Sequence, residues 1–177
     1  MKILHISDTH GKHDELSSMP DADIIIHSGD FSEYGTEEEA FAFIEWFESL
    51  AYKYKIFIPG NHDTCLIGND IEGLAENTFF LENRAVDIDG LKIYGSCLGN
   101  FNNIPDNTDI LVTHMPPLGI LDGKHNMYGD RQLLEKVFRI KPKLHLFGHT
   151  HETPGTECLE GITFSNVSGN RYHLFHV

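Results

Sequence analysis

Five short apolar runs, each ending at polar or glycine residues, constrain the fold of this chain more than any other feature. They cover residues 2–7, 23–29, 54–60, 109–114 and 143–148. Each run is rich in Ile, Leu, Val or Phe and is too short for a typical helix, which is characteristic of β-strands buried on both faces. The runs therefore predict a core built on a sheet with both faces covered.

Two segments between these runs have helical patterns. Residues 36–54 begin with Thr36 and carry Glu39 three positions later, which is the signature of a capping box. The apolar face expected for this helix comprises Ala40, Phe43, Ile44, Phe47, Leu50 and Ala51. Residues 129–142 form a second pattern that ends before Pro142, with Leu133, Leu134, Val137 and Phe138 facing inward. Alternation of strands and helices predicts an α/β core.

Turn signals elsewhere predict antiparallel additions to that core. Asp89-Gly90 lies between alternating runs in residues 86–95, and the turns Glu160-Gly161 and Gly169-Asn170 separate further strands in residues 159–177. A chain of 177 residues without repeats or a linker fits one domain over residues 1–177. The expected fold is α/β, with two packed mixed β-sheets (a β-sandwich) flanked by helices.

Composition excludes several classes of function. The formal net charge of -14 argues against a protein that grips long nucleic acid through its phosphates. The chain has no apolar run long enough to span a membrane, and its first residues lack the apolar stretch of a signal peptide. Cys65, Cys97 and Cys158 are widely spaced, so we expect reduced, packed thiols and a cytoplasmic location.

Each of the five apolar runs ends in, or is directly followed by, a potential metal ligand or catalytic group. In chain order these are Asp8 and His10, Asp30, Asn61 and His62, His114, and His149 and His151. Loops at the carboxyl ends of sheet strands converge, so these side chains are expected to meet at one edge. Mixed carboxylate and imidazole ligands favour Mn, Fe or Zn over Ca or Mg. Local turn or surface roles would explain any one motif, but the coincidence of all five favours a metal site.

These motifs, read as DTH, GD, GNHD, a strand-end histidine and GHTH over residues 8–151, resemble the five blocks of the calcineurin-like metallophosphoesterase superfamily. The finer patterns IIIHSGDFSEYGTEEE and KPKLHLFGHTHETPG are similar to the MPPED-type phosphodiesterase branch, over nearly the whole chain. The resemblance implies the metallophosphoesterase fold. It also implies a phosphodiesterase that depends on two divalent metal ions and acts on a small phosphoester such as a cyclic nucleotide.

The resemblance also assigns a role to each residue. Asp8, His10 and His151 would bind the first metal, Asn61, His114 and His149 the second, and Asp30 would bridge both, with His62 as the catalytic acid. Physical chemistry is consistent with this, because a water shared by two cations loses a proton near neutral pH and can attack phosphorus in line. Manganese is the favoured metal, with Fe or Zn as alternatives. Asp63 would orient a neighbouring group or serve a local turn.

The sequence also departs from the pattern of the family that it resembles. Residues 95–111 form a shorter connection than the MPPED-type branch usually has, which predicts an open, permissive site. The block GDFSEYG lacks the Asp-Arg-Gly of serine/threonine protein phosphatases, which argues against that activity. The glycines beside the ligands, Gly11, Gly29, Gly60 and Gly148, are expected to allow tight turns or close backbone approach.

Three alternatives remain open at the level of sequence. The first is a non-catalytic protein-binding module on the same fold, similar to the retromer subunit. The others are a phosphomonoesterase and a nuclease acting on short single-stranded ends. No membrane partner is expected, and the sequence leaves the oligomeric state, the bound metals and the natural ester undetermined.

Overall fold

A computed structural model of the chain describes residues 1–16, 18–96, 99, 101–125 and 128–177. The strands are β1 (Lys2–Ile6), β2 (Ile24–His27), β3 (Tyr54–Phe57), β4 (Thr78–Phe80), β5 (Arg84–Ile88), β6 (Leu91–Ser96), β7 (Ile110–Thr113), β8 (Leu144–Phe147), β9 (Gly155–Leu159), β10 (Ile162–Asn166) and β11 (His173–His176). The helices are α1 (Glu37–Ser49) and α2 (Arg131–Ile140), with a 3-10 turn η1 (His13–Glu15).

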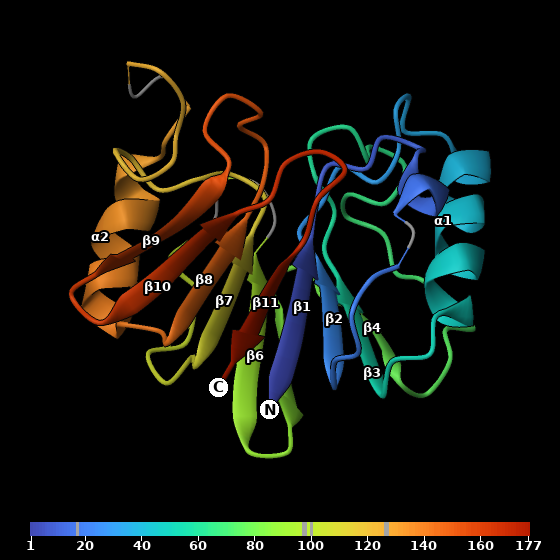
Figure 1. The fold of residues 1–177 in the computed structure, drawn as a ribbon, viewed down its shortest axis with the longest axis horizontal. Helices are drawn as coiled ribbons and strands as arrows, with labels where there is room; N and C mark the ends of the chain where they lie inside the picture. Colours follow the sequence, from blue (N-terminus) through green and yellow to red (C-terminus); the bar gives the residue numbers. More distant parts are fainter. Residues whose placement is uncertain (17, 97–98, 100, 126–127) are drawn as a thin grey trace.

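The strands form two sheets that pack face to face (Figure 1). One has the order β11-β1-β2-β3-β4, in which β1 to β4 are parallel and β11 is antiparallel. The other has the order β5-β6-β7-β8-β10-β9, in which the edge strands β5 and β9 are antiparallel to their neighbours. Helices α1 and α2 cover opposite outer faces (Figure 1). The predicted α/β sandwich of two mixed sheets flanked by helices is confirmed.

Three apolar clusters fill the spaces between these layers. The cluster between the sheets contains Ile3, Ile26, Ile56, Ile110, Val112 and Leu146 among others. Leu4 and Phe57 face α1 instead, and Leu111 and Phe147 face α2. Side chains alternate between the two faces of a strand, and both faces are covered, so most positions are apolar, with buried polar residues such as His5, Lys55 and His145 among them. This explains why the strands read as continuous hydrophobic runs.

Helix α1 begins as predicted and ends earlier. The backbone N–H of Glu39 donates to Oγ1 of Thr36 and the Glu39 carboxylate accepts from the Thr36 N–H, both at 3.2 Å, which confirms the capping box. The prediction of a helix through residue 54 is wrong, because Leu50 is extended and Tyr54 already pairs with β2. Ala51, predicted on the apolar face, is exposed. Strand pairing outcompetes helical continuation in this segment.

Helix α2 is capped by Asp130, whose Oδ1 accepts from the Leu133 N–H at 2.8 Å. It ends at Ile140, before Pro142, in agreement with the prediction. Of the positions predicted to face inward, Leu133 and Val137 are fully buried, whereas Leu134 and Phe138 are half-buried.

The turns join the strands largely as expected. Asp89-Gly90 connects β5 to β6 and Glu160-Gly161 connects β9 to β10, each within an antiparallel pair. The turn at Gly169-Asn170 differs, because it carries the chain from β10 in one sheet to β11 in the other. Strand β4 was not predicted, because no pattern noted in the sequence marks residues 78–80 as a strand.

The structure also bears on the cysteines and on membrane insertion. Cys65 and Cys158 are free thiols, and Cys97 lies outside the described residues. Cys158 lies exposed on the edge strand β9, which corrects the expectation that it is packed. Among the described residues, no helix combines the length and the apolar character needed to cross a membrane.

Candidate metal centre

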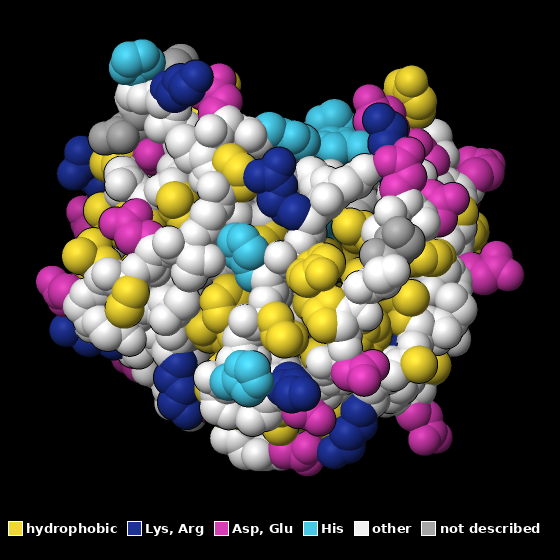
Figure 2. Space-filling model, in the orientation of Figure 1, with side chains coloured by type: hydrophobic (Ala, Val, Ile, Leu, Met, Phe, Trp, Pro, Cys, Tyr) yellow, Lys and Arg dark blue, Asp and Glu magenta, His cyan; other side chains and the backbone are white. Residues whose placement is uncertain are grey.

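The eight predicted site residues all lie on loops at one edge of the sandwich. They follow the carboxyl ends of β1, β2 and β3 in one sheet and of β7 and β8 in the other. Figure 2 shows histidine side chains gathered in a notch at this edge, between the shoulders on the α1 side and the α2 side. The two sheets therefore contribute jointly to a single site, as convergence of strand ends predicts.

One group of candidate ligands consists of Asp8, His10 and His151, whose ligand atoms lie within 4.8 Å of one another. Nε2 of His151 is 3.3 Å from Oδ1 of Asp8. The Asp8 carboxylate is 3% exposed and accepts hydrogen bonds from the Ser7 hydroxyl at 2.6 Å and the His149 N–H at 3.0 Å. These donors fix the carboxylate in place, and His151 approaches from the solvent side.

A second group consists of Asp30, His114 and His149, again within 4.8 Å of one another. Nε2 of His114 lies 3.1 Å from Oδ2 of Asp30 and 3.0 Å from Oδ1 of Asn61. The same Asn61 oxygen lies 2.9 Å from Nδ1 of His149. One carboxylate, one amide oxygen and two imidazoles thus converge on a single point, a donor set suited to a transition-metal ion.

Asp30 lies between the two groups. Its Oδ2, already close to His114, is 3.9 Å from Nε2 of His10 in the first group. Its Oδ1 accepts a hydrogen bond from the His62 N–H at 2.8 Å. A single carboxylate is therefore shared by both sets of donors, which is the arrangement that a pair of bridged cations requires.

The imidazole of His62 lies beside these groups. Its Nδ1 donates to the carbonyl of Glu33 at 2.8 Å, which leaves Nε2 as the nitrogen available to the site. Its ring centre is 4.8 Å from that of His10, and it also joins His10 and Asp30 in a third group of nearby ligand atoms. The hydrogen bond to Glu33 raises the pKa of His62, so the protonated form is favoured.

Electrostatics within the site follow from burial and pairing. Burial is the largest single influence on His114 and disfavours its charged form, but the hydrogen bond to Asp30, the negative charges of Asp30 and Asp8 and the hydrogen bond to Ser28 together outweigh it and raise the pKa of His114 to about 9. Burial and the neighbouring His114 together lower the pKa of His149. Burial alone would raise the pKa of Asp8, yet hydrogen bonds from His151 and the charge of His114 hold it well below its usual range.

Metal binding is therefore expected to release a proton from His114. At pH 7 its raised pKa keeps the metal-free imidazole protonated, whereas a ligand imidazole must be neutral. Calorimetric titration with Mn²⁺ in two buffers of different ionisation enthalpy should show at least one proton released per chain, because the raised pKa of the candidate ligand His151 adds to that of His114. Affinity should rise with pH up to about 9. Equal binding heats in both buffers would contradict the expectation.

Four of the candidate ligands have left-handed backbone conformations. The φ angles are 52° at Asp8, 42° at His10, 57° at Asp30 and 67° at His149. Such conformations cost non-glycine residues of the order of 1–3 kcal/mol each and cluster at functional sites. The strain therefore marks the same loops that carry the ligand atoms.

Gly60 and Gly148 allow the backbone to approach the carboxylates closely. A methyl group at Gly148 would overlap Oδ2 of Asp8 and the hydroxyl of Ser7, and one at Gly60 would overlap Oδ1 of Asp30. Each carboxylate is held against a backbone that has no side chain. At these two positions the predicted close approach explains the glycine.

Asp63 connects two of the ligand loops. Its fully buried carboxylate accepts from the N–H groups of Asp30 and Gly60 at 2.8 Å, and from the N–H and hydroxyl of Ser32 at 2.9 and 2.6 Å. Burial raises the pKa of Asp63 although these donors favour its ionised form. Asp63 thus fixes the loop of Asp30 relative to the loop of Asn61 and His62.

Several contacts of the site carry no signal in the sequence. The carbonyl of Ser28 accepts from Nδ1 of His114 at 2.9 Å, which directs Nε2 of that ring towards Asp30. Oε2 of Glu33 lies 3.5 Å from Nδ1 of His10. The ring of Tyr128, 43% exposed, meets His149 edge-on with centres 5.6 Å apart. Only the acidic character of Glu33, within the block GDFSEYG, could have been noted from sequence.

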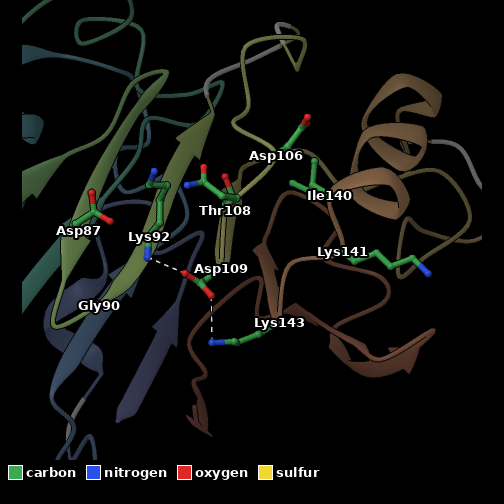
Figure 3. Close-up of a pocket in the computed structure, with 10 residues that line it drawn as sticks. Asp87, Gly90, Lys92, Asp106, Thr108, Asp109, Ile140, Lys141 and Lys143 are labelled. Carbon is green, nitrogen blue, oxygen red and sulfur yellow. Dashed lines mark hydrogen bonds and ion pairs between the residues drawn. The ribbon is translucent and has the colours of Figure 1, made fainter.

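A cavity of about 500 Å³ lies at the opposite edge of the six-stranded sheet (Figure 3). It is lined by residues at the amino ends of β7 and β8 and by the turn between β5 and β6. In it, Asp109 pairs with Lys143 at 3.1 Å and accepts from the Lys92 N–H at 3.0 Å. Since the candidate ligands lie at the other edge, this cavity is separate from the metal centre.

Comparison with known proteins matches this chain to one family. A family model described as calcineurin-like phosphoesterase covers residues 1–153. Human metallophosphoesterase domain-containing protein 1 is 35% identical over 214 aligned positions, which include 94% of this chain and 65% of the human protein. The chain thus spans slightly less than two thirds of that relative, and the alignment exceeds its own length, so the relative carries insertions.

Solved structures share the fold at low sequence identity. A structure titled as a novel archaeal phosphodiesterase superposes with a TM-score of 0.60 at 19% identity, covering 99% of each chain. GAP50, titled as the anchor in the inner membrane complex of Plasmodium, superposes with a TM-score of 0.61 at 13% identity, covering 96% of this chain and 72% of that one. These likenesses establish the architecture alone.

Proposed function

The chain belongs to the calcineurin-like phosphoesterase family, a family of metal-dependent phosphoester hydrolases, and from that premise we propose that it is a phosphodiesterase with two divalent metal ions. Its substrate in this proposal is a small phosphodiester such as a cyclic nucleotide. The observation that carries the proposal is the carboxylate of Asp30, shared between two groups of ligand atoms.

In this proposal the ligands divide between the two ions. One ion is held by Asp8, His10 and His151, the other by Asn61, His114 and His149, and both by Asp30. Manganese is the proposed metal, with Fe or Zn as alternatives. When bound, the two ions activate water and neutralise charge that develops on the phosphoryl oxygens.

His62 is proposed as the general acid. The hydrogen bond from its Nδ1 to Glu33 leaves Nε2 to protonate the alkoxide as the ester bond to phosphorus breaks. The hydrogen bond from its backbone to Asp30 keeps the imidazole close to the proposed bridge. Asp63 supports His62 and Asp30 by fixing the loops that carry them. The cytoplasmic location expected from the sequence remains part of this proposal.

Hydrolysis of bis-p-nitrophenyl phosphate tests the proposal directly. Chelator-stripped protein should be inactive, and the same protein reconstituted with Mn²⁺ should release p-nitrophenolate. Parallel assays with p-nitrophenyl phosphate would distinguish a diesterase from a monoesterase. Absence of turnover with both esters, in protein shown by calorimetry to hold metal, would overturn the proposal.

The second candidate function is a non-catalytic binding module. It is considered because GAP50, which shares the fold, is described in its title as an anchor. Metal-loaded protein that hydrolyses no phosphoester would support this function. The intact set of ligand residues and the presence of His62 favour the enzyme.

A further inference from the structure

We propose that Glu39, on the first turn of α1, is a positioning residue for the catalytic acid His62. The inference rests on the proposed function, and it concerns a residue that touches neither substrate nor metal ligands. It acts through the loop of residues 33–36, which connects the metal-ligand loop to α1.

The Glu39 carboxylate binds more of this loop than a helix cap requires. A capping box needs only the hydrogen bond from the Thr36 N–H, which Oε2 accepts at 3.2 Å. In addition, Oε2 accepts from the Tyr34 N–H at 3.0 Å, and Oε1 accepts from the Glu33 N–H at 3.1 Å. Three backbone donors of the loop are therefore held by one side chain.

Side-chain packing contributes little to holding the outer part of this loop. Tyr34, its largest residue, is 82% exposed, and Glu33 is exposed as well. Gly35 is buried and packs so closely on His62 and Thr64 that a methyl group there would overlap them. The loop is thus held against the His62 segment at Gly35, and Asp63 holds Ser32 directly before it. Between these two points, the backbone N–H groups of Glu33 and Tyr34 are bound by the Glu39 carboxylate.

Glu33 transmits this position to His62. Its carbonyl accepts the hydrogen bond from Nδ1 of the His62 imidazole at 2.8 Å, and its N–H is the group that Glu39 binds. The direction of the ring, and so of Nε2, follows the carbonyl. Because proton transfer requires hydrogen-bond distance to the leaving oxygen, a small shift of this carbonyl weakens the acid.

The test uses two diaryl esters that differ in leaving group. Bis-p-nitrophenyl phosphate releases a stable phenolate that needs little protonation, whereas diphenyl phosphate releases a basic phenolate that benefits from an acid. In the Mn²⁺-loaded full chain, Glu39→Ala should reduce kcat about tenfold or more with diphenyl phosphate and less than about threefold with bis-p-nitrophenyl phosphate. Glu39→Gln, which retains one acceptor oxygen, should be intermediate.

Two control variants separate positioning from loss of charge or of the helix cap. Glu38→Ala removes an exposed carboxylate from the same helical turn and should leave both rates unchanged. Thr36→Ala removes the hydroxyl that caps α1 but keeps the backbone donors that Glu39 binds. It should lower Tm without the selective loss. A similar loss with both esters in Glu39→Ala, or a selective loss in Thr36→Ala, would overturn the inference.

His62→Ala separates this inference from the proposed function. His62→Ala should lose at least as much kcat with diphenyl phosphate as Glu39→Ala does, and much less with bis-p-nitrophenyl phosphate. If this difference between the two esters is absent, the proposed acid role of His62 fails. If His62→Ala is selective and Glu39→Ala is not, only the inference fails. If the unaltered protein is inactive, nitrogen NMR of the histidine rings still tests the positioning of His62. Glu39→Ala should change the Nδ1 signal of His62, and Glu38→Ala should leave it unchanged. An unchanged Nδ1 signal in Glu39→Ala would overturn the inference.

Discussion

Asp30→Asn is expected to abolish metal-dependent hydrolysis of bis-p-nitrophenyl phosphate, with a loss of about 10³-fold or more. The substitution preserves the shape of the side chain but removes the charge that both ligand groups share. An amide bridges two cations poorly, so metal content measured by elemental analysis should fall from two ions per chain in the loaded protein. His114 also loses its partner carboxylate, so its pKa should fall.

Asp87→Asn is the matched control for this experiment. Asp87 is an exposed aspartate on β5, away from the metal centre, and its substitution makes the same change in net charge. It should leave metal content and turnover unchanged. Retention of two ions and of turnover within tenfold in Asp30→Asn would refute the assignment of Asp30 as the bridge.

Gly148→Ala is expected to damage both stability and metal binding. The added methyl group would overlap the Asp8 carboxylate and the Ser7 hydroxyl, which are buried and cannot move into solvent. Overpacking of this kind costs about 1–3 kcal/mol. For a domain of this size we expect Tm to fall by about 2–4 °C for each kcal/mol. Displacement of Asp8 should also weaken metal binding, measured by calorimetric titration.

Gly155→Ala makes the same substitution where there is room for it. A methyl group at Gly155, on the edge strand β9, would lie 3.7 Å from Leu121, an ordinary contact distance. We expect little change in Tm or metal affinity. If Gly148→Ala behaved like Gly155→Ala in both measurements, the Asp8 carboxylate would not be held as tightly as the structure indicates.

The layers of the fold could be predicted because the strands are buried on both faces. Such strands are recognisable as short apolar runs, and the ends of β1, β2, β3, β7 and β8 then predict where polar side chains gather. The hairpin turns at Asp89 and Glu160 were predictable for a similar local reason, since glycine follows each of them.

Other features depend on tertiary contacts that leave no local pattern. Helical periodicity continues past Ser49, but pairing of β3 with β2 takes over the chain at Tyr54. The orientations of His114 and His62 depend on the backbone carbonyls of Ser28 and Glu33, and every residue has a carbonyl. The capping role of Glu39 was predictable from spacing, whereas its additional hydrogen bonds depend on how the preceding loop folds back.

The left-handed conformations at the ligand positions also bear on how such a protein would change under relaxed selection. Glycine adopts φ angles like those of His10 and His149 without strain, and the His149 N–H that binds Asp8 would survive the substitution. In a lineage no longer selected for turnover, the substitutions that relieve this strain would therefore be the same ones that remove its metal ligands. Relief of backbone strain at these two positions and loss of the proposed ligands would thus occur together, while the architecture is kept.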